Sequence, residues 1–188
     1  MSVMVDREVE AARALLARYC DTYPLADDAP VPVDDIAESL LGLLVRLAPL
    51  EEGVSGILLL RQREIRVNST ECERWPARRR FTVAHEIGHW ELHASEVEEG
   101  FICRFGDVRE EQPDKGSPEQ VREREANRFA AELLMPESRV RARVGAVGVQ
   151  VPELADEFDV SALAMAWRLH NLEYITQRPN PQDYGVTV

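Results

Sequence analysis

The feature that most constrains this chain is the pentapeptide HEIGH, which runs from His85 to His89. On an α-helix, residues four apart lie one above the other, with roughly 6 Å between their Cβ atoms, so two imidazoles can bind one metal ion. The spacing HExxH is typical of zinc peptidases. The sequence therefore predicts a helix that carries His85 and His89 as metal ligands.

Glu86 follows the first histidine and is the candidate general base. Zinc lowers the pKa of a bound water to about 7, and a neighbouring carboxylate can take the proton as that water attacks a carbonyl. An apolar stripe that includes Phe81 and Gly88 is flanked by His85 and His89, so we expect both histidines to face the core. The alternative is a pair of core histidines satisfied by hydrogen bonds alone.

A catalytic zinc site needs a third protein ligand and one open position. On a straight helix His93 lies about 6 Å past His89, too far for one tetrahedral ion, so we expect it to cap the helix or line the cleft. Glu123 is the better candidate, because it borders the apolar stripe of a second helix in EREANRFAAELLMP, and a core-facing glutamate needs a cation. The alternative is that Glu123 is a solvated helix charge.

Residues near Glu123 offer supporting roles. Asn127 lies one helical turn further on and could accept the free imidazole N–H of a ligand histidine. Glu125 is expected to point elsewhere. As donors to the oxyanion of the reaction, His93 and Tyr174 are the candidates.

Apolar periodicity predicts the remaining elements. We expect helices at residues 6–19, 36–41 (capped by Asp34 or Asp35 and ended by Gly42), 76–93, 119–135, 137–144, 152–157 and 161–172, a strand in LLVRLAPL, and a hairpin formed by GILLL and REIRVN. The acidic segment 94–118 is expected to be a loop. If GILLL or a neighbouring strand forms the sheet edge above the metal, its free backbone groups could hold a peptide as an added strand.

Composition limits the partners and the compartment. The 188 residues carry a formal net charge of −12, so a phosphate backbone repels the chain, and a basic protein partner fits better than nucleic acid. No apolar run approaches the roughly 20 residues that span a bilayer, and the N-terminus MSVMVDREVEAAR lacks the apolar stretch of a signal peptide. Three widely spaced cysteines fit a reducing compartment. We expect a cytoplasmic protein that binds neither membrane nor nucleic acid directly.

At these motifs the chain resembles the ImmA/IrrE family of metallo-endopeptidases. RRRFTVAHEIGHWELH is similar to the family's first motif nearly residue for residue, and EREANRFAAELLMP is similar to its second. The lead-in of helix, strand and hairpin and the C-terminal ELADEFDVSALAMAWRLHNLEYI are also similar. The resemblance covers about residues 10 to 175.

The resemblance implies an α+β fold with a thermolysin-like (gluzincin-type) core, in which a small, twisted, mostly antiparallel sheet lies beside the HExxH helix and C-terminal helices follow. It implies that His85, His89 and Glu123 hold zinc, with manganese or iron as alternatives, and that Glu86 is the base. It also implies an endopeptidase that cleaves a helix-turn-helix repressor and so derepresses phage, mobile-element or stress genes. No fused regulator precedes the peptidase portion, so we expect that target to act in trans. The alternative is a non-catalytic protein that senses or binds a repressor.

We divide the chain into a zinc-peptidase domain (1–145), a helix-turn-helix-like extension (146–176) and a tail (177–188). From residue 150 onward the chain has six acidic residues and only two arginines, Arg168 and Arg178, whereas a DNA reader needs a basic face, so we expect the extension to pack or to dock a partner. Four arginines, at position 74 and positions 78–80, are expected to form a solvated face, with some paired to carboxylates, rather than to grip substrate.

Overall fold

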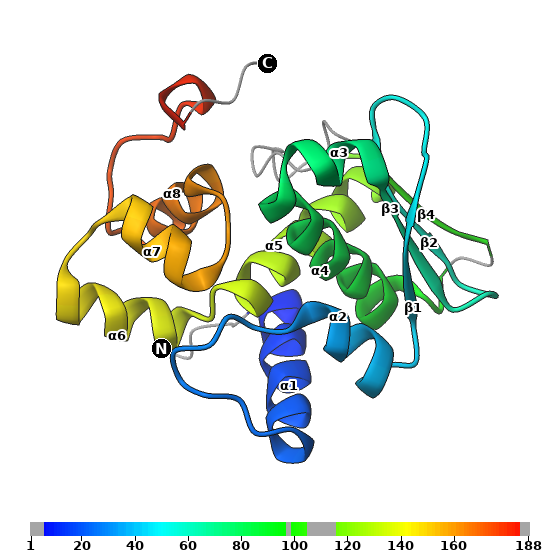
Figure 1. Cartoon of the computed structure of the whole chain (residues 1–188), viewed down its shortest axis with the longest axis horizontal. Coiled ribbons are helices and arrows are strands. Elements are labelled where there is room, and N and C mark those ends of the chain that lie inside the picture. Colours follow the sequence, from blue (N-terminus) through cyan, green and yellow to red (C-terminus); the bar gives the residue numbers. More distant parts are fainter. Residues whose placement is uncertain (1–5, 97–98, 105–115, 185–188) are drawn as a thin grey trace.

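The computed structural model describes residues 6–96, 99–104 and 116–184. Within these ranges, helices and a four-stranded sheet form an α+β fold (Figure 1). The sheet lies on one side of two central helices, and the last helices of the chain lie on the other side (Figure 1). In the described ranges, no helix combines the length and the apolar character that a membrane crossing requires.

The first helix, α1 (Arg7–Thr22), is amphipathic as predicted. Its buried residues Ala12, Leu15 and Tyr19 are three and four positions apart, which brings them to one helix face. Through this packing α1 supports α5 (Pro118–Leu134), the helix that carries Glu123.

The short helix before Gly42 differs from its prediction. Helix α2 (Val33–Asp35) begins earlier and continues into one π-helical turn, Ile36–Leu40. Neither Asp34 nor Asp35 caps it, because both lie inside the helix, and the carboxylate of Asp35 accepts hydrogen bonds from two hydroxyl groups instead. Gly42 ends the segment with φ +65°, a left-handed conformation that glycine adopts without a steric cost.

The sheet has the strand order β1-β3-β2-β4. Its strands are β1 (Leu44–Ala48), β2 (Val54–Leu59), β3 (Glu64–Asn68) and β4 (Gly100–Arg104). The predicted strand in LLVRLAPL is confirmed, and so is the hairpin, since β2 and β3 pair antiparallel. Strand β1 is parallel to β3 and β4 is antiparallel to β2, so the sheet is mixed.

Strand β4 lies within the segment 94–118, and the prediction of a continuous loop there is wrong. Phe101 and Cys103 are buried whereas Ile102 is about half exposed, which is the two-residue alternation of a strand with one buried face. Acidic and turn-forming residues on both sides hide this short pattern in the sequence. Most of the remaining acidic segment lies outside the described residues.

Helices α3 (Ser69–Arg74) and α4 (Pro76–His93) follow the sheet. Helix α4 has the predicted bounds, and its first residue is a proline, which needs no hydrogen-bonded N–H there. Helix α5 begins with a capping box, in which Ser117 and Gln120 each accept a hydrogen bond from the other's backbone N–H.

Helices α4 and α5 meet closely at Gly88. A Cβ atom at this position would lie 3.1 Å from the ring of Phe129 and 3.2 Å from the Cα of Ala126. The absence of a side chain at Gly88 therefore lets the two backbones approach. This close contact sets the distance between the HEIGH motif and the residues of α5.

The chain ends with α6 (Glu137–Val147), α7 (Val151–Phe158) and α8 (Ala162–Asn171), and a 3₁₀ turn at 181–184 lies in the expected tail. Buried side chains of α7 and α8 belong to the same apolar cluster as the central helices. Arg168 of α8 is buried, and its guanidinium binds the carboxylate of Glu132 and the carbonyl of Met135. This arginine is therefore engaged inside the protein rather than on a surface that could meet DNA.

Candidate metal centre

The structure brings together the three residues that the sequence suggests as metal ligands. His85 and His89 lie on the buried face of α4, with their Nε2 atoms 3.0 Å apart. Glu123 reaches them from α5, with carboxylate oxygens 3.1 Å from Nε2 of His85 and 3.2 Å from Nε2 of His89. This group could bind a metal ion, since its ligand atoms all lie within 4.8 Å of one another.

The spacing of these atoms fits a tetrahedral ion. With ligand distances of about 2.0–2.1 Å, neighbouring ligand atoms of a tetrahedral zinc site are roughly 3.3 Å apart, close to the 3.0–3.2 Å found here. Two imidazole nitrogens and one carboxylate are also a donor set that zinc accepts, with a fourth position left for water or substrate. The residues present therefore fit a catalytic metal site.

The charges of the group favour the metal-binding forms of two of its members. Burial raises the pKa of Glu123, but hydrogen bonds with His85 and His89 outweigh it and hold that pKa at about 2. Burial also lowers the pKa of His89 to about 4. At neutral pH Glu123 is thus ionised and His89 neutral, as metal coordination requires.

Glu86 lies beside this group and is fully buried. Neither of its carboxylate oxygens has a hydrogen-bond partner among the described residues, and burial raises its pKa to about 8. Its carboxylate lies against Gly56 of β2, where an added Cβ would be 2.8 Å from Oε1 of Glu86 and 2.5 Å from a methyl group of Thr82. A glycine at this point of the strand leaves the space that Glu86 occupies.

The supporting residues differ in part from their predictions. Asn127 accepts from Nδ1 of His85 at 2.9 Å, the contact that the sequence suggests. His93 lies outside the ligand group and contacts His89, with 3.2 Å between their Nδ1 atoms. Glu125 lies outside the ligand group as well, and its carboxylate is 2.8 Å from Nε2 of His93. The four-residue repeat of histidines on α4 is the signal that could have placed His93 in this network.

Strand β4, like β2, borders the candidate site. Phe101 of β4 stacks on the imidazole of His89, with 4.3 Å between ring centroids. Strand β2, which contains most of GILLL, is interior to the sheet, whereas β4 is an edge among the strands that the structure describes. A peptide added to the sheet beside the candidate site would therefore pair with β4 rather than with GILLL.

The arginine cluster at the start of α4 is not a solvated face. Arg78 pairs with Glu71, Arg79 with Asp34 and Arg80 with Asp159. These three arginines link α4 to other parts of the chain. The predicted pairing with carboxylates agrees with the structure, whereas the predicted solvated face does not. The fourth, Arg74, lies over the ring of Trp75.

Tyr174 is also engaged away from the ligand group. Its hydroxyl lies 3.4 Å from a guanidinium nitrogen of Arg141 in α6, so its candidacy as an oxyanion donor is not supported.

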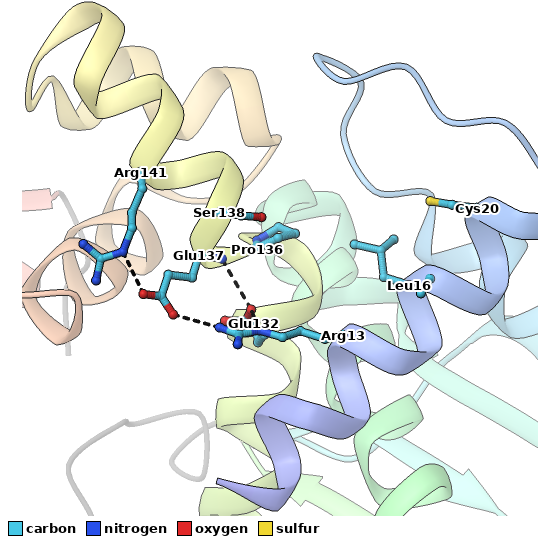
Figure 2. Close-up of a pocket in the computed structure, with 9 residues that line it drawn as sticks. Arg13, Leu16, Cys20, Glu132, Pro136, Glu137, Ser138 and Arg141 are labelled. Carbon is cyan, nitrogen blue, oxygen red and sulfur yellow. Dashed lines mark hydrogen bonds and ion pairs between the residues drawn. The ribbon is translucent and has the colours of Figure 1, made fainter. Parts of the chain in front are cut away.

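A surface hollow of about 610 Å³ lies between α1 and α6 (Figure 2). Its charged side chains pair with one another: Arg13 contacts Glu132 and Glu137, and Glu137 contacts Arg141. Neither the three candidate ligands nor Glu86 line this hollow. The hollow lies where α1 packs beside the start of α6, and it is separate from the candidate metal site.

Comparisons with known proteins agree with this fold. The family model Peptidase M78, described as the IrrE N-terminal-like domain, matches residues 39–170. Among solved structures, the chain is similar to a Mycobacterium tuberculosis transcriptional regulator, with 18% sequence identity and a TM-score of 0.59. The match covers 92% of this chain and 48% of that protein, so the chain spans about half of its length. No curated protein matches the chain significantly.

Proposed function

The chain belongs to the IrrE N-terminal-like family of peptidases, the ImmA/IrrE family, and we propose that it is a zinc-dependent endopeptidase with a thermolysin-like core. The observation that carries the proposal is the convergence of two imidazoles and one carboxylate on a common point, beside a buried glutamate whose oxygens have no hydrogen-bond partner among the described residues. An HExxH peptidase needs this ligand set and this base.

We assign His85, His89 and Glu123 as the ligands of the ion. Zinc fits this set of two nitrogens and one carboxylate, and manganese and iron are the alternatives. When bound, the ion supplies a Lewis acid that polarises a peptide carbonyl and lowers the pKa of water to about 7. Asn127 supports the site by holding the His85 ring so that Nε2 faces the ion.

Glu86 carries the proton transfers. Its carboxylate is buried next to the ligands and lacks a hydrogen-bond partner within the described ranges, so it is available to a water molecule at the reacting carbonyl. It takes the proton from that water during attack, and it then delivers the proton to the nitrogen of the leaving amine. The slot beside Gly56 restricts where the carboxylate can lie.

The substrate is an extended peptide bound along β4. This strand is a sheet edge, and Phe101 packs it directly over His89. Edge strands can bind a peptide through backbone hydrogen bonds. Peptides methylated at successive backbone nitrogens test this mode, because only alternate nitrogens should pair with β4 and raise KM when methylated. A KM that is the same for every methylated peptide would contradict it.

The target we propose is a helix-turn-helix repressor that is cleaved in trans, which derepresses the genes it controls. The net charge of −12 supports this class, because DNA-binding proteins are basic and opposite charges favour encounter.

The test uses the repressor encoded nearest to this chain and zinc-loaded protein, with products identified by mass spectrometry. Wild-type protein should cleave it, whereas Glu86→Gln should bind zinc and the repressor without cleaving. Cleavage by the variant at the wild-type rate would refute the role of Glu86. Tight binding without cleavage by the wild type would favour the alternative, a non-catalytic repressor-binding sensor.

A further inference from the structure

His93 is a buried histidine outside the group of three ligands. It is 1% exposed, and both ring nitrogens have protein partners. Its Nδ1 lies 3.2 Å from Nδ1 of His89, and its Nε2 lies 2.8 Å from a carboxylate oxygen of Glu125. His89, His93 and Glu125 thus form a continuous chain that leads from the ligand group to α5.

The donors and acceptors of this chain have one consistent arrangement. A histidine that binds a metal through Nε2 is protonated at Nδ1, so His89 can donate only from Nδ1. His93 must then accept at Nδ1 and carry its own proton on Nε2. That proton points to Glu125, which accepts because a carboxylate has no proton to donate. Each contact therefore fixes the tautomer of the next ring.

We propose that His93 and Glu125 are positioning residues that hold His89 in the tautomer and orientation needed to present Nε2 to the metal. The proposal rests on the metal site of the proposed function and deepens it. His85 has an amide acceptor, Asn127, whereas His89 has an imidazole backed by a carboxylate. Acceptors of this kind orient metal-binding histidines and make them better donors to the ion.

A packing role for His93 is the competing explanation. Its ring centroid is 6.0 Å from that of Phe101 and 5.3 Å from that of His89, so it also fills space under β4. The two roles separate by substitution. An apolar side chain of similar size can fill the space but cannot accept a proton, whereas asparagine can place an acceptor oxygen near the position of Nδ1.

The first experiment measures zinc affinity by competition with a chromophoric chelator. His93→Leu should lower the affinity by about 10- to 100-fold, the usual loss when such a partner is removed. His93→Asn should recover most of it. Glu125→Gln, a change of nearly equal volume at a side chain that is 27% exposed, should lower affinity roughly tenfold without loss of fold. The matched control is His170→Asn in α8, at a ring that contacts the backbone carbonyl of Ile175 and the ring of Trp167, and it should leave affinity unchanged.

A double variant distinguishes action through His93 from a general effect of charge. Glu125→Gln should have no further effect when His93 is already leucine, because the chain is then broken. An equal loss in both backgrounds, or wild-type affinity in His93→Leu, would overturn the proposal.

Nitrogen NMR of the zinc-loaded protein reads the tautomers directly, and the chain has only four histidines to assign. His85 and His89 should be protonated at Nδ1 and His93 at Nε2; a proton on Nδ1 of His93 overturns the inference. Absence of zinc binding by the wild type would overturn the inference together with the proposed function. The expected affinities and tautomers without peptide cleavage would support the inference and refute only the peptidase activity.

Discussion

Replacement of Glu86 by glutamine should change how the stability of the metal-free protein depends on pH. Glu86 is fully buried with neither oxygen hydrogen-bonded to any described residue, and burial raises its pKa from 4.5 to about 8. Because the folded-state pKa is raised, the contribution of this group to stability is fully present below pH 4.5. It is lost as the pH rises through 8, since ionisation then occurs more readily in the unfolded chain.

The magnitude follows from the two pKa values. One pKa unit corresponds to about 1.4 kcal/mol, so the gap between 4.5 and about 8 amounts to about 5 kcal/mol over the whole window. Between pH 5 and pH 7.5 this ionisation should lower the unfolding free energy of the wild type by about 3 kcal/mol. Glutamine does not ionise. The free energy of unfolding of Glu86→Gln relative to wild type should therefore rise by about 3 kcal/mol across this range.

Urea unfolding in EDTA at several pH values, followed by tryptophan fluorescence, measures this difference. The control is Glu10→Gln, the same chemical change at an exposed position of α1. A difference between Glu86→Gln and wild type that stays constant with pH would refute the reasoning. With zinc bound, the positive ion favours the ionised carboxylate, and the pH dependence of the difference should shrink.

Two further substitutions test the packing around the site, and a third tests a buried ion pair between α5 and α8. Gly88→Ala should cost about 1–3 kcal/mol in unfolding free energy and weaken zinc binding, because the new methyl group forces α5 away; urea unfolding and calorimetry check this. Gly56→Ala should lower kcat while zinc affinity is retained, because the added Cβ displaces Glu86. An equal loss of kcat and zinc affinity would contradict the idea that the space beside Gly56 positions the Glu86 carboxylate. Arg168→Met should cost about 3–5 kcal/mol by urea unfolding, since it leaves a buried carboxylate without its closest partner. The exposed pair of Arg143 is its control, and Arg143→Met should cost less than about 1 kcal/mol.

The sequence predicts the helices that bear the candidate ligands because their signals are strong and local. Pro76 marks the start of α4, the HEIGH motif gives its chemistry, and an apolar stripe gives its buried face. Glu123 could be selected because it borders the stripe of α5, which the structure shows buried against α4. Periodicity over four or five turns outweighs errors at single residues.

What the sequence misses depends on contacts between distant segments. Strand β4 has only five residues, and its alternation becomes visible once β2 supplies a partner. The contact between Glu125 and His93 requires the close approach of α4 and α5, which helical position alone does not reveal. Asp35 looks like a helix cap until the fold places the hydroxyl of Tyr19 beside it.

The close approach of α4 and α5 at Gly88 has a consequence for how the protein folds. Helices α4 and α5 approach there so closely that a side chain at position 88 would meet Ala126 and Phe129, within an apolar cluster that extends from α1 to α8. We therefore expect the chain to fold without a bound metal ion, unlike small domains that fold only when zinc is bound. Under the proposed function, zinc binding would then set the fraction of active protein and not the fraction of folded protein.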